Sequence, residues 1–185
     1  MWIVLLILVV LIVAFIGMYN SLVKLRVRVD NSWADIDVQL KRRYDLIPNL
    51  VETVKGYASH EKDTLEAVIE ARNRAMAVQD PEAKAEAENV LTGALRQLFA
   101  LAEAYPQLRA VESFTELQGS LNEIEDAVQN ARRYYNAVVR DYNTKIHTVP
   151  SNLVAGMFGF QPRQFFGLED EHEREAPKVD FGTAG

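Results

Sequence analysis

The three histidines, His60, His147 and His172, are the side chains best suited to metal binding or proton transfer, because the chain has no cysteine. They form neither a His-Glu-x-x-His motif nor the pair of Glu-x-x-His motifs that di-iron bundles use. No glycine-rich phosphate loop and no Gly-x-Ser-x-Gly motif is present. The sequence therefore predicts no enzymatic activity, no metal and no bound cofactor.

Arg, Tyr, Asp and Asn residues gather in two clusters that are suited to recognition. The first cluster is Arg42, Arg43, Tyr44, Asp45, Pro48 and Asn49, and the second is Arg132, Arg133, Tyr134, Asn136, Asp141, Tyr142 and Asn143. One interpretation is structural: hydrogen bonds between helices fix their register, and the polar groups freed at Pro48, such as the Tyr44 carbonyl, are satisfied locally. The alternative is a surface for a protein partner, because Arg and Tyr are typical interface anchors. Apolar stripes beside both clusters favour the structural interpretation. The other carboxylates are mostly interleaved with Lys and Arg, which is typical of a solvated helix face.

An uncharged, almost wholly apolar segment, residues 1–18, precedes these clusters. Extended through Val23 as a helix, it spans about 30–35 Å, enough to cross a hydrocarbon core. No basic residue precedes it and no Ala-x-Ala site follows it, so a cleaved signal peptide is disfavoured. We expect residues 1–23 to be a retained, single-pass membrane anchor.

The charge distribution predicts how the chain is oriented in the membrane. Lys24, Arg26 and Arg28 follow the anchor, so the positive-inside rule places the C-terminal body in the cytoplasm and the short N-terminus outside. The same basic flank would favour contact with anionic membrane lipid. The whole chain has a net charge of −6, and its acidic body argues against nucleic-acid binding.

Helical periodicity continues from the anchor to residue 150, with apolar residues three or four positions apart. Four helices are expected, over residues 22–58, 59–78, 81–105 and 113–148. Their predicted N-caps are Ser59 for the second helix, Asp80 before Pro81 for the third, and a Ser113–Glu116 capping box for the fourth. No segment is predicted to be a β-strand, so the fold is predicted to be all-α. The short loops make successive helices antiparallel neighbours. An N-terminal transmembrane helix continues into an elongated antiparallel four-helix bundle over residues 24–150.

Beyond Pro150 the chain is rich in phenylalanine and then in acidic residues. Because the last helix runs back toward the anchor, residues 151–166 are expected to cap the bundle near the membrane, with Phe158, Phe160, Phe165 and Phe166 close to the bilayer. Either this segment plugs the open end of the bundle, which we favour, or it contacts lipid headgroups or a membrane partner. Residues 167–185 are predicted to be an acidic, disordered tail.

Several long runs of residues resemble the LemA family of bacterial membrane proteins. The similarity covers nearly all of residues 1–166 and is carried by the N-terminal anchor and by residues 33–40, 42–51, 132–136, 141–145, 150–152 and 156–160. It implies a bacterial single-pass protein of the inner membrane with a mostly helical body and the short N-terminus outside, but it supplies no activity. Some relatives occur beside membrane metalloproteases, and related proteins are implicated in magnetosome membrane formation.

These observations predict a non-enzymatic, membrane-anchored scaffold or adaptor. Such a protein would form a homo-oligomer, dock a membrane protein such as a membrane protease, or do both. The alternative is a membrane-shaping protein that acts through lipid contacts and oligomerisation.

Overall fold

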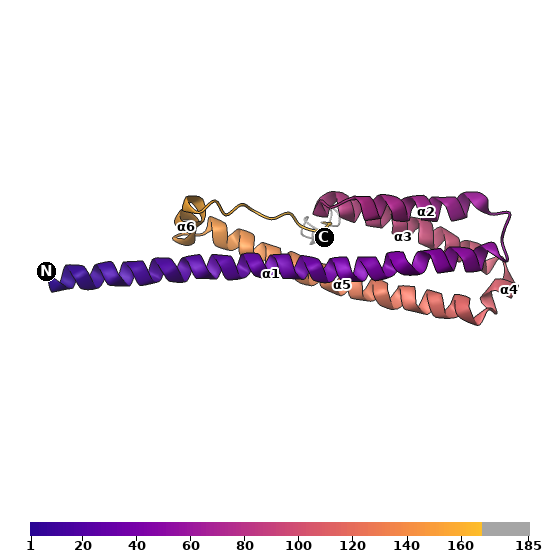
Figure 1. Ribbon diagram of the computed structural model, residues 1–185, viewed down its shortest axis with the longest axis horizontal. Coiled ribbons are helices and arrows are strands. Elements are labelled where there is room, and N and C mark those ends of the chain that lie inside the picture. The colour runs from indigo at the N-terminus through magenta and orange to yellow at the C-terminus, as the bar shows by residue number, and fades with distance from the viewer. Residues whose placement is uncertain (168–185) are drawn as a thin grey trace, which may run out of the picture.

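The computed structural model describes residues 1–167, which form helices and connecting segments with no β-strand among them (Figure 1). The helices within this range are α1 (Trp2–Lys55), α2 (Lys62–Ala77), α3 (Pro81–Glu103), α4 (Pro106–Arg109), α5 (Glu112–His147) and α6 (Ser151–Met157). The predicted all-α fold with a long apolar N-terminal helix is confirmed. At 1.5 Å per residue, α1 is about 80 Å long.

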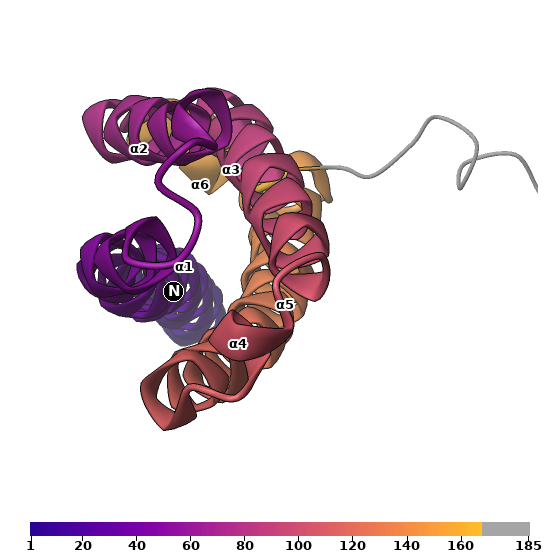
Figure 2. The same ribbon diagram turned by 90° about the vertical axis from the view of Figure 1, so that its right-hand side faces the viewer.

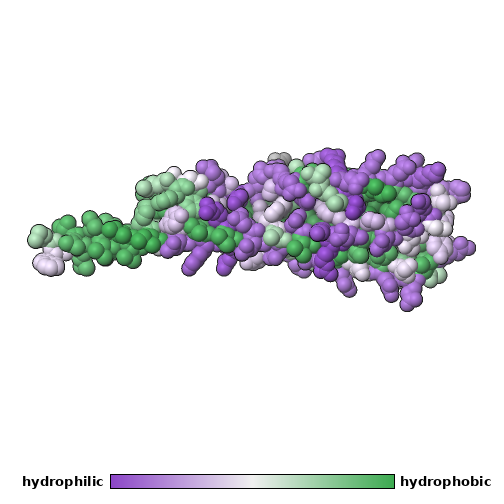
Figure 3. Space-filling model, viewed as in Figure 1, coloured by the Kyte–Doolittle hydropathy of each residue, from purple (hydrophilic) through white to green (hydrophobic). Residues whose placement is uncertain are grey.

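The first part of α1 stands apart from the rest of the molecule. Its side chains from Trp2 to Val13 are exposed, and it is the one helix of residues 1–167 that is long and apolar enough to cross a membrane. Figure 3 shows this end of the molecule as an apolar rod that enters a largely hydrophilic body. The same helix then continues without a break into that body, so its position there is fixed by the core that it forms with the other helices.

The long helices α1 and α5 run antiparallel and pack along each other (Figures 1 and 2). The shorter α2 and α3 form a hairpin beside the half of this pair that is distant from the N-terminus. Apolar residues at helical spacing build the shared core. On α1 its fully buried members are Leu22, Ile36, Leu40, Ile47, Leu50 and Val54. Because the hairpin is short, it leaves the other half of the α1/α5 pair to the short helix α6 and the irregular segment that follows it.

Only one of the three predicted N-caps is present. Asp80 Oδ1 accepts hydrogen bonds from the backbone N–H groups of Glu82 and Ala83 at 3.2 and 3.1 Å, and Pro81 opens α3. The predicted cap at Ser59 is wrong, because a turn around the buried Ala58 delays the start of α2, which is preceded by Glu61.

The Ser113 capping box is also wrong, because α5 begins one residue before Ser113. The Val111 carbonyl already accepts hydrogen bonds from the N–H groups of Phe114 and Thr115, so Val111 is the N-cap. The short helix α4, which the sequence analysis did not include, leads the chain into this turn.

A glycine turn at the end of α6 sends the chain back along the bundle. Gly159 has a φ of +66°, and the N–H of Phe160 donates to the carbonyl of Ala155 at 3.0 Å, as in a Schellman motif. Residues 160–167, here called the strap, then run in an irregular, extended path toward the α2/α3 hairpin (Figure 1). Of the predicted acidic tail, Gly167 belongs to the strap and the remainder lies outside the described residues.

Candidate functional site

Two members of the first polar cluster point into the bundle and join a buried group of charges. We call this group the ion core; it consists of Arg43, Tyr44, Lys84, Glu88 and Glu125. The Arg43 guanidinium pairs with Glu88 of α3 and with Glu125 of α5, each at 3.2 Å. It also donates a hydrogen bond of 2.8 Å to the hydroxyl of Thr92. One α1 side chain therefore connects two other helices.

The remaining members of the ion core surround the Glu88 carboxylate. The Tyr44 hydroxyl donates to Glu88, and the Lys84 ammonium lies 5.5 Å from the centre of the Tyr44 ring. Burial raises the pKa of Glu88, although the charges of Arg43 and Lys84 act in the opposite direction. Burial and the nearby Glu88 raise the pKa of Tyr44. Two cations and two carboxylates balance in charge, so the group is suited to fixing helix register.

Lys84 and Glu88 were not among the predicted site residues, because charges interleaved along a helix are typical of a solvated face. Their exposed fractions are 3% and 6%. They lie in the same four-then-three spacing as Leu91, Leu95 and Leu98, which form the buried stripe of α3. Charged residues at positions of an apolar stripe were therefore the signal that indicated burial.

Pro48 has a partner that lies on another helix. Proline cannot donate to the carbonyl four residues earlier, so the carbonyl of Tyr44 is left free within α1. Arg72 of α2 donates its Nε–H to this oxygen at 2.8 Å. The interruption in α1 thus becomes an attachment point for α2.

The other members of the first cluster face outward. Arg42, Asp45, Pro48 and Asn49 are exposed, and Arg42 and Asp45 line a groove of about 480 Å³ between α1 and α5. Its other lining residues are Gln39, Leu46, Ser120, Glu123, Ile124 and Ala127. The cluster therefore divides into a buried half and a solvent-facing half.

The second cluster holds the strap by hydrogen bonds from side chains to backbone. Asn143 accepts from the N–H of Arg163 and donates to its carbonyl, both at 2.9 Å. Asn136 contacts Phe166 in the same way, at 2.9 and 3.2 Å. The hydroxyls of Tyr142 and Tyr135 donate to the carbonyls of Gln161 and Gln164 at 3.0 and 2.9 Å. Tyr135 was not among the predicted cluster residues. We call these four α5 side chains, together with Arg132, the ladder.

The spacing of the ladder matches the geometry of the strap. The dipeptide Tyr-Asn occurs at 135–136 and again seven residues later at 142–143. Seven residues of helix rise about 10.5 Å, and three residues of extended chain span about 10 Å. The two tyrosines bind the carbonyls of positions 161 and 164, and the two asparagines bind positions 163 and 166. Each of these two sets of strap positions is three residues apart, so both Tyr-Asn pairs meet equivalent backbone groups.

The far end of the strap is enclosed by aromatic and charged groups. The side chain of Arg132 donates to the carbonyl of Phe166 at 3.1 Å and also to that of Gly167. The buried Phe166 ring packs edge-on against Trp33 of α1, with ring centres 5.5 Å apart. Near the middle of the strap, Arg163 forms an ion pair of 2.8 Å with Asp30.

The sequence pattern offered no sign of the Arg163–Asp30 pair, because its members are 133 residues apart. Three residues of the second cluster, Arg133, Tyr134 and Asp141, are exposed and make no contact with the strap within residues 1–167.

The near end of the strap and α6 pack against the apolar part of α1. The Phe158 ring lies 4.7 Å from that of Tyr19 and 6.0 Å from that of Phe15, measured between ring centres. Phe160 is buried beside Tyr19, and the guanidinium of Arg26 lies 5.2 Å from the centre of its ring. Leu153, Met157 and Phe158 leave apolar surface exposed; Figure 3 shows this surface beside the apolar rod.

The residues that were predicted to lie near the membrane are therefore found at two different levels along α1. Phe158 and Phe160 lie at the level of residues 15–26 of α1. Phe166 lies further along the body beside Trp33, and Phe165 lines a groove with residues 82–89 of α3. Lys24 and Arg28 are exposed on α1 and line a cleft that faces α5. Residues 1–167 contain no group of three or more His, Asp or Glu side chains that is suited to hold a metal ion.

Comparison with known proteins gives consistent matches over most of the chain. The sequence model of the LemA family matches residues 32–181. Protein LemA of Metamycoplasma hominis is 24% identical over 175 residues, covering 92% of this chain and 76% of that protein. Magnetosome protein MamQ 2 of Paramagnetospirillum magneticum is 26% identical over 185 residues, covering 84% of this chain and 68% of that protein. Neither name states an enzymatic activity.

Proposed function

This chain belongs to the LemA family, and from that premise we propose that it is a non-enzymatic scaffold or adaptor anchored in a membrane by α1. The observation that carries the proposal is the continuity of α1 from Trp2 to Lys55. A helix that enters the bundle without a hinge holds the body at a constant height and angle above the bilayer. A rigid platform of this kind suits the presentation of a docking surface to membrane proteins.

The groove between α1 and α5 supplies a suitable docking surface. Arg42, Asp45 and Glu123 give it charges of both signs, and α2 and α3 contribute no lining residue to it. Polar grooves of this type suit reversible contacts, in which arginine is a frequent anchor. We assign a membrane protein partner such as a membrane protease, or a second copy of this chain, to this surface.

Native mass analysis of the full chain in mild detergent tests self-association and partner binding together. We expect a homo-oligomer or a co-purifying membrane protein, and we expect the double variant Arg42→Ala/Asp45→Ala to lose it. The matched control is Lys41→Ala/Lys62→Ala, because both lysines are exposed and neither lines the groove. A wild-type chain that is monomeric and carries no co-purifying protein would contradict the proposal.

We further propose that the chain lies in the bacterial inner membrane with its body in the cytoplasm. The basic residues Lys24, Arg26 and Arg28 after the span support this orientation. Since the chain lacks cysteine, Ser113→Cys places a single label at the exposed start of α5, far from the span. A membrane-impermeant maleimide should label it only after cell lysis. Labelling in intact cells would place the body outside the cytoplasm.

A second candidate function is membrane shaping, which the exposed apolar surface of α6 favours. Leu153 and Met157 are 66% and 72% exposed, and the neighbouring Phe158 packs against residues 15 and 19 of the span. A short helix inserted beside a transmembrane helix widens the area that the protein occupies in one leaflet. Such asymmetric insertion bends a bilayer.

Reconstitution of the full chain into vesicles tests this second function. A polarity-sensitive label on Leu153→Cys should report an apolar environment, whereas the same label on Ser113→Cys should report water. Wild-type protein should reduce vesicle diameter in electron micrographs, and Met157→Ser/Phe158→Ser should not. A water-like signal at position 153 would remove the basis of this function.

A further inference from the structure

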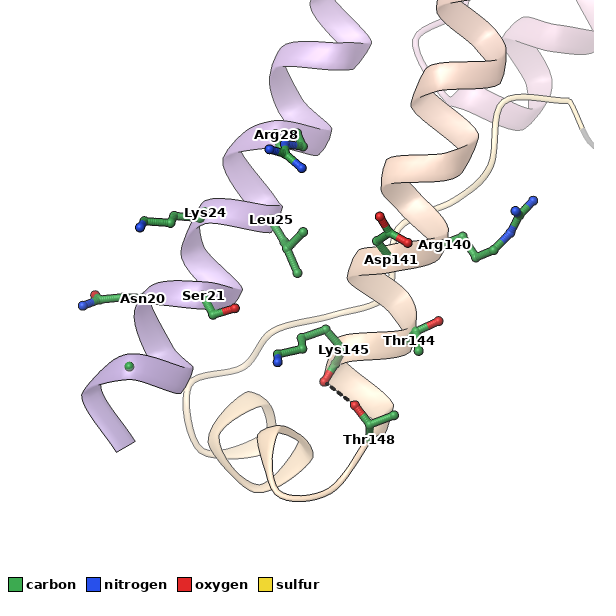
Figure 4. Close-up of a pocket in the computed structure, with 11 residues that line it drawn as sticks. Asn20, Ser21, Lys24, Leu25, Arg28, Arg140, Asp141, Thr144, Lys145 and Thr148 are labelled. Atoms are coloured by element: carbon green, nitrogen blue, oxygen red, sulfur yellow. Dashed lines mark hydrogen bonds between the residues drawn. The ribbon is translucent and has the colours of Figure 1, made fainter. Parts of the chain in front are cut away.

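A cleft at the membrane end of α1 and α5 is lined by more cations than its surroundings balance. It has a volume of about 790 Å³ and is bounded by residues 17–28 of α1 and 140–148 of α5. Its charged lining residues are Lys24, Arg28, Arg140, Lys145 and Asp141. Figure 4 shows Lys145 extending into the gap between the two helices and Arg28 above it, with Lys24 and Arg140 on the two outer flanks.

These four cations have no ionic partner in the part of the chain that the structure describes. None of them forms an ion pair within residues 1–167, and the nearby Asp141 is likewise unpaired there. The contrast with Arg43, which pairs with two carboxylates, is clear. Lys145 extends into the gap between the helices and Arg28 lies above it, whereas Lys24 and Arg140 extend outward from its flanks. Cations at a cleft without paired protein counter-charges attract an anion, and Ser21 adds a hydroxyl donor on the α1 side.

The height of the cleft on α1 indicates the kind of anion. The hydrocarbon core is about 30 Å thick, so an α-helix that starts near Met1 leaves it near Asn20. Lys24 and Arg28 then lie about 6 and 12 Å further along the helix axis, within reach of the headgroup layer. The contact of Phe158 with Phe15 and Tyr19 places α6 at the same boundary. Phosphate groups of lipids are the anions concentrated at this level.

We propose that this cleft binds the phosphate of an anionic phospholipid headgroup, with Arg28 and Lys145 as its direct ligands and Lys24 and Arg140 as flanking charges. Ser21 donates to a phosphate oxygen, and the negative charge of Asp141 weakens the attraction for the phosphate. The site needs both α1 and α5, so a bound lipid connects the two helices where the α2/α3 hairpin does not reach. This proposal rests on the membrane anchoring of α1 proposed above.

Lipid retention by the full chain tests the proposal. The protein is reconstituted in nanodiscs that contain equal amounts of phosphatidylglycerol and phosphatidylcholine, extracted in mild detergent, and analysed by native mass spectrometry. Wild-type protein should retain phosphatidylglycerol in preference to phosphatidylcholine. Each cation near the headgroups strengthens binding about fivefold, so Arg28→Gln/Lys145→Gln should reduce this preference on the order of 20-fold. Asp141→Asn, which removes a negative charge, should increase it.

Two controls distinguish binding at the cleft from an effect of net charge and from an effect on membrane anchoring. Lys41→Gln/Lys62→Gln loses the same charge away from the cleft and should retain phosphatidylglycerol as the wild type does. Flotation with vesicles reports anchoring independently, and every variant should float. Circular dichroism should be unchanged, because Arg28 and Lys145 make no side-chain contact within residues 1–167 that folding requires.

Three results would overturn the proposal. The first is equal phosphatidylglycerol retention by the wild type and Arg28→Gln/Lys145→Gln, with both floating. The second is an equal loss in the Lys41→Gln/Lys62→Gln control. The third is displacement of the retained lipid by millimolar glycerol phosphate in detergent, which would assign the cleft to a soluble phosphate. Failure of the wild type to float would instead contradict the anchoring on which the proposal rests.

Discussion

The ion core and the ladder are both built from buried and half-buried polar side chains, yet they hold different structures in different ways. In the ion core, charged side chains from α1, α3 and α5 contact one another. In the ladder, side chains of one helix contact the backbone of an irregular segment. The ion core lies where four helices meet. The ladder runs from the start of α3, where Gly167 lies beside Ala85, into the part of the α1/α5 pair that the α2/α3 hairpin does not cover.

The α1/α5 pair is therefore packed against two kinds of element, a helical hairpin in one half and an irregular strap in the other. A helix satisfies its own backbone, so its side chains remain available for apolar packing and ion pairs. The strap has no internal hydrogen-bond pattern, and its buried N–H and C=O groups need partners from elsewhere. The ladder supplies these partners at the spacing of an extended chain. The two regions should therefore respond differently to the loss of a single side chain.

Arg43→Ala should give the largest loss of stability. It would leave the buried Glu88 carboxylate without its cationic partner, and breaking a buried pair in this way typically costs about 3–5 kcal/mol. The measurement is the free energy of unfolding of the full chain in detergent. The matched control Arg42→Ala should change it by less than about 0.5 kcal/mol, because Arg42 is exposed and contacts only Gln39 within residues 1–167.

Replacing both partners distinguishes a charge effect from a packing effect in the ion core. Arg43→Met/Glu88→Met removes one cation and the carboxylate paired with it, leaves Lys84 and Glu125 in place, and should recover part of the stability lost by Arg43→Ala. A double variant as unstable as the single one would show that the ion core acts through the shape of Arg43 rather than its charge.

Asn136→Ala should give the next largest effect, and it should be local. The substitution leaves the N–H of Phe166 without its side-chain acceptor, at an expected cost of about 1–3 kcal/mol, while the C=O of Phe166 keeps the hydrogen bond from Arg132. Hydrogen exchange at the Phe166 amide should accelerate by one to two orders of magnitude, while exchange in α3 stays unchanged. Asn143→Ala should have a smaller effect, since it contacts the exposed Arg163. Faster exchange throughout α3 would mean that the strap is required for the whole bundle.

Two glycines, one just before the strap and one at its end, offer a finer comparison within the same region. Both have positive φ, at +53° for Gly167 and +66° for Gly159, so alanine at either costs about 1 kcal/mol through the backbone. A Cβ at Gly167 would also lie 2.8 Å from the Arg132 guanidinium and 2.9 Å from Ala85, whereas one at Gly159 meets nothing within 4 Å. Hydrogen exchange at Phe166 should therefore accelerate more in Gly167→Ala than in Gly159→Ala. Equal rates would show that Arg132 moves aside without cost.

The helical half of the molecule was largely predictable and the strap half was not. Three-and-four spacing located α1, α3 and α5 and the antiparallel α1/α5 pair, because helix packing repeats its signal every turn. The path of the strap depends on single contacts between distant residues, such as Arg163 with Asp30, for which no period exists. The repeated Tyr-Asn pair was visible in the sequence, but its meaning depends on the matching three-residue spacing of the strap. Similarly, nothing in the sequence around Arg72 indicates that its side chain binds the carbonyl freed by Pro48.

The pH dependence of stability should give the smallest effect, and it tests the ion core alone. Burial raises the pKa of Glu88 in the folded chain above its ordinary value of about 4.3 in the unfolded chain. Between these two values the folded state binds more protons than the unfolded state. The stability that Glu88 contributes is therefore present in full below the ordinary pKa and is lost as the pH rises through the raised pKa.

Glu88→Gln isolates this contribution, because the other titrating groups are common to both proteins and cancel in the difference. The measurement is the midpoint of thermal unfolding in one detergent from about pH 4 to pH 8. Relative to Glu88→Gln, the wild type should lose stability as the pH rises, and the same comparison for Glu52→Gln, an exposed carboxyl, should be flat. A wild type that gains relative stability with rising pH would mean that the attraction of Arg43 and Lys84 outweighs burial. The ion pairs would then stabilise the bundle overall, and Glu88 in the folded chain would be more stable as the charged carboxylate than as the protonated acid.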